Sequence, residues 1–267
     1  MSDLFSLAGK TALVTGATHG IGAMIARGFI EAGVRVYITA RNKAECDAMV
    51  AELSPVGECV AIPADLSREE ECVRLAREIK EREDRLDILV NNAGTGWSAP
   101  LEQFPAEGWD KVLDLNLKAP FYLTRELASL LKQSGTPEDP ARIVNIGSVD
   151  ALRVAEFPTY SASTSKAAVH HLTRILAADF APSVTVNAIA PGSFPSRMMA
   201  EVLEGFRPVI EAVTPLKRIG RAADVVGTTV FLCSAAGSYL TGTVIPVDGG
   251  LSTCRLGFVP PQFLKAA

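Results

Sequence analysis

The sequence has few of the residues that build metal centres or disulfide frameworks. It holds five cysteines, an odd number, and three histidines in 267 residues, and no two cysteines form a CxxC pair. Zinc sites and disulfide-stapled domains need closely spaced cysteines or histidines. We therefore expect no metal and no disulfide. Scattered, reduced cysteines of this kind are typical of a cytoplasmic protein.

The sequence also lacks a strong net charge and a long apolar run. Lys and Arg number 26 against 30 Asp and Glu, so the formal net charge is −4. This balance argues against a nucleic-acid partner, which would require a basic surface. No apolar run reaches the roughly 18 residues of a membrane span. The first residues, MSDLFSLAGK, do not have the pattern of a signal peptide.

What the sequence does contain is a regular alternation of apolar, β-branched runs with stretches of helical spacing. This alternation is typical of βαβ units and a parallel sheet, and nearly continuous apolar runs indicate a sheet covered on both faces. We predict an α/β fold, with residues 1–267 forming a single doubly wound Rossmann-like domain around a seven-stranded parallel sheet. The predicted strands are 11–15, 34–40, 59–64, 86–92, 141–148, 183–190 and 243–247, and the predicted helices are 21–32, 42–53, 68–83, 107–133, 161–181 and 222–235.

Two segments fall outside the alternation. Residues 192–218 interrupt it, and we interpret about 193–215 as a long substrate loop, because loops of this length are usually functional. The C-terminal tail 254–267, CRLGFVPPQFLKAA, is apolar and contains proline. It either docks on this subunit or on a partner, or it is a loose terminus.

A glycine-rich turn, TGATHGIG at 15–22, follows the first strand and precedes a helix pattern. Glycines let the backbone approach a pyrophosphate closely, and the helix N-terminus offers N–H groups and a positive dipole end. The GxxxGxG spacing differs from the common GxGxxG fingerprint, so a simple tight turn is the alternative. The candidate cofactor contacts in this turn are Gly16, Thr18, His19, Gly20, Ile21 and Gly22.

The end of the second strand predicts which dinucleotide binds. An acidic residue there contacts the ribose 2′-hydroxyl of NAD, whereas an arginine accommodates the 2′-phosphate of NADP. This sequence has Arg41 and no acid at that point. With Thr18 and His19 in the glycine turn, Arg41 favours NADP(H) over NAD(H). The alternative is that Arg41 is a surface charge at the start of a helix.

An ordered series of motifs over roughly residues 8–253 resembles the short-chain dehydrogenase/reductase family. The chain looks most like bacterial NADPH-dependent reductases of 3-oxoacyl groups, and SFPSRM after the PG motif resembles those associated with rhamnolipid formation. In chain order the motifs are TGATHGIG (15–22), DL (65–66), NNAG (91–94), NL (116–117), NIGS (145–148), SKAAVHHL (165–172), NAIAPG (187–192) and VDGG (247–250).

The resemblance implies further cofactor contacts. Asp65 and Leu66 would lie beside the adenine, and Pro191 and Gly192 would flank the nicotinamide. Ser196 would supply a hydroxyl where family members usually carry a threonine. The floor beneath the cofactor would come from Asn91, Asn92, Ala93 and Gly94.

The resemblance also implies the catalytic group. The family reduces a carbonyl with a tyrosine as proton donor, and a lysine one helical turn later lowers the pKa of the phenol. Ser148 would orient the carbonyl, Asn116 would hold a water, and Lys166 would be the lysine. The position of the tyrosine, however, holds Ala162.

Tyr160 is close to the missing phenol but is six residues before Lys166. On a helix this spacing separates two side chains by about 120°, so Tyr160 substitutes for the acid only if the helix begins later or bulges. The segment TYSASTSK resembles family sequences that read TYSYSTSK. Ala162 is therefore either an engineered knockout or a natural loss. Loss of a general acid costs about 10²–10⁴-fold in rate, whereas cofactor binding should survive.

We predict an NADP(H)-dependent oxidoreductase that reversibly reduces the ketone of a hydrophobic or acyl substrate to a secondary alcohol and is crippled by Ala162. The alternative is a naturally non-catalytic NADP(H)-binding sensor or scaffold, but the presence of Ser148, Asn116 and Lys166 favours the enzyme. Apolar side chains such as Phe194 and Phe206 suit such a substrate or are core and interface packing. The resemblance implies a homotetramer or homodimer.

Overall fold

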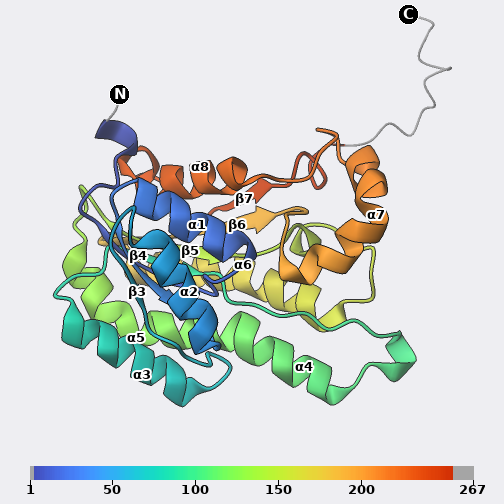
Figure 1. Cartoon of the computed structure of the whole chain (residues 1–267), viewed down its shortest axis with the longest axis horizontal. Helices are drawn as coiled ribbons and strands as arrows, with labels where there is room; N and C mark the ends of the chain where they lie inside the picture. Colours follow the sequence, from blue (N-terminus) through green and yellow to red (C-terminus); the bar gives the residue numbers. More distant parts are fainter. Residues whose placement is uncertain (1–2, 255–267) are drawn as a thin grey trace, which may run out of the picture.

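In the computed structural model, which describes residues 3–254, the strands form one sheet whose neighbouring strands are all parallel (Figure 1). Their order is β3-β2-β1-β4-β5-β6-β7, so the chain winds outward from β1 and then returns to begin again at β4. This reversal leaves a crevice at the carboxyl ends of β1 and β4, where doubly wound folds bind ligands. The strands are β1 Thr11–Thr15, β2 Arg35–Thr39, β3 Cys59–Ala61, β4 Ile88–Asn91, β5 Ala141–Ile146, β6 Val184–Pro191 and β7 Val244–Val247.

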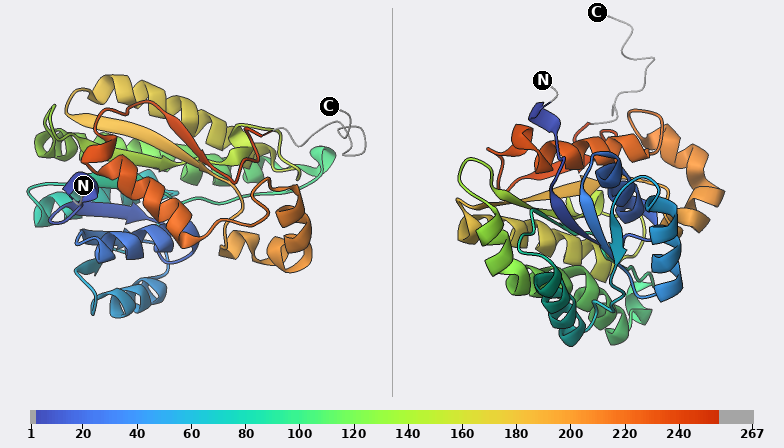
Figure 2. Two further views of the ribbon diagram at one scale, coloured as in Figure 1. Left: turned by 90° about the horizontal axis from the view of Figure 1, so that it is seen from above. Right: turned by 60° about the vertical axis from the view of Figure 1, so that its left-hand side comes forward.

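Helices cover both faces of the sheet (Figure 2), so the predicted fold class is confirmed. One face packs against α1 (Gly20–Glu31), α2 (Lys43–Leu53) and α8 (Ala222–Cys233). The opposite face packs against α3 (Glu69–Arg82), α5 (Ala119–Ser134) and α6 (Tyr160–Phe180). Within the described residues, no helix is long and apolar enough to cross a membrane.

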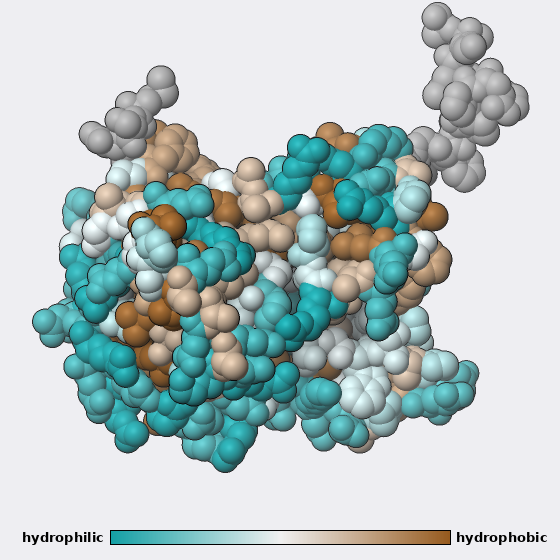
Figure 3. All heavy atoms as spheres, viewed as in Figure 1, coloured by the Kyte–Doolittle hydropathy of each residue, from teal (hydrophilic) through white to brown (hydrophobic). Residues whose placement is uncertain are grey.

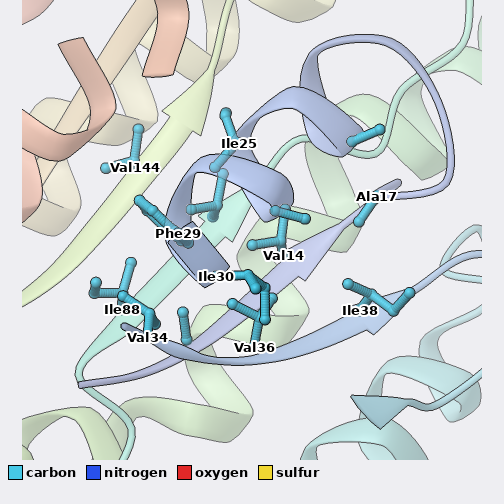
Figure 4. Close-up of a cluster of buried hydrophobic side chains, with 14 of the residues drawn as sticks. Val14, Ala17, Ile25, Phe29, Ile30, Val34, Val36, Ile38, Ile88 and Val144 are labelled. Carbon is cyan, nitrogen blue, oxygen red and sulfur yellow. The ribbon is translucent and has the colours of Figure 1, made fainter. Parts of the chain in front are cut away.

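The layer between α1 and the sheet is a closely packed apolar core. Phe29 and Ile30 of α1 lie against Val14 and Val36 of the central strands (Figure 4), and these side chains are almost completely buried. Close packing of this kind holds an element rigidly. The core therefore fixes the N-terminus of α1 relative to the end of β1, which is where the glycine turn lies.

The helix expected over 107–133 is divided into three parts. It consists of α4 (Ala106–Leu113), a π-helical segment (Asp114–Lys118) and α5. A π turn adds one residue without breaking the apolar pattern, so spacing alone reads the whole stretch as one helix. Such turns often occur at functional sites, and this one contains Asn116.

The substrate segment 193–215 is not a continuous loop, contrary to our expectation. After a short 3-10 turn at Arg197–Met199 it forms α7 (Ala200–Val213), which lies at one end of the molecule (Figure 1). Gly205 and Pro208 in this helix have low helix propensity. Their presence hides the helical spacing of Phe206, Val209 and Val213 in the sequence. The tail predicted at 254–267 lies outside the described residues except for Cys254.

Candidate active site

The glycine turn forms a cradle that side chains would fill. Gly16 and Gly20 have φ of +63° and +56°, a region that favours glycine. A Cβ on Gly22 would lie only 2.3 Å from the Gly16 carbonyl oxygen and from Asn92 Nδ2. His19, the N-cap of α1, makes no capping hydrogen bond with its side chain. The first N–H groups of α1 can therefore receive an anion, and the turn fits a phosphate.

The NNAG segment is fastened to this turn. Thr15 Oγ1 accepts hydrogen bonds from the N–H groups of Asn92 and Ala93, both at 2.9 Å. Asn92 Nδ2 donates to the carbonyls of Thr15 and Gly16 at 2.8 and 3.0 Å. The ends of β1 and β4 therefore form one floor, and the last residue of the motif, Gly94, continues it.

A pocket of about 560 Å³ opens above this floor. Its size suits a small-molecule or cofactor site. Asp65, predicted beside the adenine, does not line the pocket itself but lies between two lining residues, Ala64 and Leu66, and its Oδ1 accepts from the N–H and Oγ of Ser67 at 3.2 and 2.8 Å. The predicted cofactor residues that line the pocket are Gly16, Thr18, His19, Arg41, Leu66, Ala93 and Gly94.

The segment after β6 folds over the glycine turn. Pro191 is the last residue of β6, and the Gly192 N–H donates to the Val247 carbonyl at 3.0 Å. A Cβ on Gly20 would lie 2.9 Å from Ser196 Cβ. Ser196 Oγ accepts from the Met199 N–H at 3.2 Å and so caps the 3-10 turn. The structure therefore places Ser196 beside the predicted phosphate site.

Lys166 is the buried cation of the site. Its Nζ donates to the Ile146 carbonyl at 2.7 Å, and burial lowers the pKa of Lys166 to about 8. A Cβ on Gly94 would lie 3.5 Å from Lys166 Nζ and 3.2 Å from Asn116 Oδ1. Gly94, Asn116 and Lys166, which lie far apart in the sequence, therefore meet at one point.

Asn116 is held by the backbone of the neighbouring loop. Its Oδ1 accepts from the Thr95 N–H at 2.8 Å, and its Nδ2 donates to the Thr95 carbonyl and to Ser165 Oγ, both at 3.0 Å. Ser165 Oγ in turn donates to the Ala162 carbonyl at 2.7 Å. The π segment is therefore joined to α6 beside Lys166.

Ser148 and His170 lie on the segments that follow Ile146 and Lys166 along the chain. Ser148 follows β5 and caps a 3-10 turn, its Oγ accepting from the Asp150 N–H at 3.1 Å. His170 lies one helical turn after Lys166, and its buried Nε2 has no hydrogen-bond partner among the residues that the structure describes. Burial, helped by the charges of Lys166 and Arg174, lowers the pKa of His170 to about 4. At neutral pH His170 therefore adds no charge to the site.

No phenol stands one turn before Lys166, where α6 presents Ala162. Tyr160 is the first residue of α6, so Tyr160 and Lys166 lie on the same helix. Their side chains therefore point about 120° apart around the helix axis. Its ring packs edge-on against Phe104 with centroids 5.3 Å apart, and it is 36% exposed. The arrangement gives Tyr160 a packing contact with Phe104.

Apolar side chains gather near the predicted substrate region. Figure 3 shows hydrophobic surface over α7. Phe194 does not belong to this surface: it is only 3% exposed, belongs to the main core, and sits where a Cβ on Gly220 would clash. The exposed apolar side chains of the region are Leu152, Val154, Phe157, Met198, Phe206, Val209 and Val213.

Two charged residues of the pocket wall escaped the sequence analysis. Glu45 on α2 and Arg197 before α7 both line the cavity. Arg197 lies in the SFPSRM motif, and Glu45 follows the helix cap Asn42 by three residues, but neither position signals a shared site. Within residues 3–254, no group of three or more His, Cys, Asp or Glu side chains could hold a metal ion.

Comparison with known proteins adds independent evidence. A family model described as enoyl-(acyl carrier protein) reductase matches residues 16–252. A rhamnolipids biosynthesis 3-oxoacyl-[acyl-carrier-protein] reductase of Pseudomonas aeruginosa is 46% identical over 94% of this chain and 99% of its own length. Gluconate 5-dehydrogenase of Gluconobacter oxydans is 34% identical over 94% of this chain and 97% of its own.

Solved structures are similar over the same length. The RhlG/NADP active-site complex of Pseudomonas aeruginosa has a TM-score of 0.91 at 46% identity, covering 94% of this chain and 100% of that one. An NAD(P) dependent gluconate 5-dehydrogenase of Beutenbergia cavernae with bound NADP has a TM-score of 0.85 at 36% identity, covering 93% and 98%.

Proposed function

The chain belongs to the short-chain dehydrogenase/reductase family, and from this we propose that it is an NADP(H)-dependent carbonyl reductase whose chemical step is impaired by Ala162. One observation carries the proposal. The glycine turn and Gly94 line one pocket, and Asn116 and Lys166 lie beside Gly94, whereas Ala162 on the same helix as Lys166 carries no hydroxyl.

Cofactor binding would use backbone more than side chains. The N–H groups at the start of α1 would hold the pyrophosphate, and Arg41 at the pocket wall would meet a 2′-phosphate. The two similar solved structures hold NADP, which supports this choice. When bound, the nicotinamide would supply the hydride that reduces the carbonyl carbon.

The proton for the carbonyl oxygen is the part of the reaction that the chain performs poorly. Ser148 would orient the carbonyl, and Asn116 would support the proton path toward Lys166. Lys166 holds a proton at a buried Nζ, with a pKa near 8, but its Nζ is hydrogen-bonded to Ile146. Without a hydroxyl at position 162 to deliver that proton, we expect a rate about 10²–10⁴-fold below that of a complete site.

For the substrate we propose a 3-oxoacyl compound or another hydrophobic ketone. The exposed apolar side chains before and on α7 suit an acyl chain, and the similar Pseudomonas aeruginosa protein is named as a 3-oxoacyl reductase. We further propose that the protein works in the cytoplasm, in keeping with its scattered cysteines, and as a homotetramer or homodimer, as the family resemblance implies.

Ala162→Tyr tests the proposal directly. NADPH oxidation is followed for the unmodified chain and this variant over a panel of 3-oxoacyl thioesters, cyclic diketones and hydrophobic ketones. We expect Ala162→Tyr to be at least about a hundredfold faster on its best substrate. Ala162→Phe is the matched control, since it fills the same space without a hydroxyl, and it should stay slow.

A different outcome favours the alternative function. If Ala162→Tyr binds NADPH but turns over nothing on the panel, the chain is better described as a dinucleotide-binding sensor or scaffold. If the unmodified chain is already as fast as Ala162→Tyr, the assignment of position 162 is wrong, and Tyr160 becomes the residue to replace.

A further inference from the structure

Three segments far apart in the sequence are joined by charged contacts across the pocket. Arg197 Nη2 donates to Glu45 Oε1 at 3.1 Å and lies 2.5 Å from His19 Nε2. Because arginine can only donate, His19 Nε2 accepts and the ring proton is on Nδ1. That nitrogen faces Glu45 Oε2 at 3.5 Å and Thr18 Oγ1 at 3.0 Å. We call Arg197, His19 and Glu45 the clasp.

The clasp lies at the end of the pocket where the second strand gives way to α2. Arg41 and Asn42 line the same wall, and Glu45 lies in the first turn of α2. A carboxylate is out of place here, because the other charged groups of the wall, Arg41 and Arg197, suit an anion. Glu45 therefore serves as the counter-ion of Arg197 in this structure.

The contacts of the clasp are easily exchanged. The Arg197 side chain is 67% exposed, His19 is 40% exposed and Glu45 is 28% exposed. Exposed ion pairs contribute little to stability and are screened by salt. A phosphate monoester is a stronger partner, because it carries nearly two negative charges against one on Glu45. Its oxygens can also accept two parallel hydrogen bonds from the guanidinium, whereas Arg197 Nη2 donates one to Glu45 Oε1.

We propose that Arg197 exchanges Glu45 for the 2′-phosphate of NADP(H), so that this residue helps to select the dinucleotide. The inference rests on the proposed NADP(H) binding and adds to it a selectivity residue on the substrate segment. Arg197 opens the 3-10 turn that leads into α7. Binding of the 2′-phosphate by Arg197 would therefore fix the start of α7. NAD(H) has no 2′-phosphate, so with NAD(H) Arg197 would stay paired with Glu45.

The test compares the affinities of NADPH and NADH by fluorescence titration at one ionic strength. In Arg197→Ala, NADPH binding should weaken about tenfold, the order expected for a lost charged hydrogen bond, while NADH binding changes less than about twofold. Arg197→Lys should recover only part of the loss, since it lacks the guanidinium fork. Arg207→Ala is the control, because Arg207 lies on α7, which follows the turn of Arg197, but pairs with Glu211.

Glu45→Gln gives the opposite signature. Removing the competing carboxylate should tighten NADPH binding several-fold and leave NADH binding nearly unchanged. A second readout is cleavage by a glutamate-specific protease at Glu201, Glu204 and Glu211 of α7. NADP⁺ should protect these sites more than NAD⁺ in the unmodified chain, and this difference should disappear in Arg197→Ala.

The outcomes separate this inference from the proposed function. If Arg197→Ala weakens both nucleotides equally, Arg197 contacts the pyrophosphate that they share, and the exchange is refuted. If it changes neither while the unmodified chain binds NADPH, the clasp is a surface ion pair and only this inference fails. If the unmodified chain binds neither nucleotide, the proposed function fails first and the exchange with it.

Discussion

Restoring a phenol with Ala162→Tyr should create a pH dependence that Lys166 sets. The two positions are one helical turn apart, which places their Cβ atoms about 5–6 Å from each other. At a separation of about 5 Å and an effective dielectric constant of about 20, an ammonium stabilises a phenolate by about 3 kcal/mol. This corresponds to about two pKa units, so the phenol should titrate near 8 rather than near 10.

The sign follows from the chemistry. Carbonyl reduction consumes a proton and needs the phenol, so its rate should be constant at low pH and fall as pH rises through about 8. Alcohol oxidation needs the phenolate, so its rate should rise over the same range. Burial already lowers the pKa of Lys166 to about 8. The two groups therefore titrate as a coupled pair, and the midpoint belongs to the pair.

The assay is the absorbance of NADPH in both directions, at saturating substrate and cofactor. The control is Lys166→Ala in the Ala162→Tyr background, in which the midpoint should move up toward about 10, the ordinary pKa of tyrosine. A midpoint that is the same with and without Lys166 would refute the reasoning. So would a flat profile through pH 8 in an active Ala162→Tyr.

Three further changes have defined expectations. Arg41→Ala should weaken NADPH binding about tenfold and leave NADH binding unchanged in a fluorescence titration, because only NADPH carries the phosphate that the guanidinium would meet. Tyr160→Phe, made together with Ala162→Tyr, should leave turnover within about twofold of that of Ala162→Tyr alone. The Tyr160 ring packs against Phe104, and we expect it to take no part in proton transfer. Asn145→Ala should lower the free energy of unfolding by about 1–3 kcal/mol in urea denaturation, because it breaks the buried contacts Asn91–Asn145–Thr173. An unchanged NADPH affinity in Arg41→Ala, an unchanged free energy of unfolding in Asn145→Ala, or a large loss of turnover in Tyr160→Phe would contradict the corresponding expectation.

The fold could be predicted because its signals are local. Apolar, β-branched runs that alternate with helical spacing identify the seven strands and most of the helices, and parallel pairing follows from the helices between them. The misses have physical causes. A π turn at Asp114–Lys118 adds a residue without changing the apolar pattern, and the helix α7 contains Gly205 and Pro208, whose low helix propensity is overcome in context.

Some residues of the candidate site could be predicted from local motifs, and others are brought together only by the fold. The glycine turn is a local motif, and its predicted contact with a phosphate agrees with the geometry of Gly16, Gly20 and Gly22. The roles of Ser148, Asn116 and Lys166 stay predictions, although the structure brings the last two together. The pair of Glu45 and Arg197 could not be found from spacing, because 152 positions separate the two residues. The two residues meet only because the segment after β6 folds over the glycine turn.

An alanine at position 162 leaves the other contacts of the described site in place, because none of them uses that side chain. Lys166 is held by the Ile146 carbonyl, Asn116 by Thr95 and Ser165, and Ser148 by the Asp150 N–H. Residue 162 contributes to these contacts only through its backbone carbonyl, which alanine and tyrosine share. An affinity for NADPH therefore carries no information about catalysis in this chain. The two hypotheses, an impaired enzyme and a non-catalytic binder, predict the same pocket and the same NADPH binding curve. They differ only in the turnover of Ala162→Tyr, which rises above that of the unmodified chain only if the chain is an impaired enzyme.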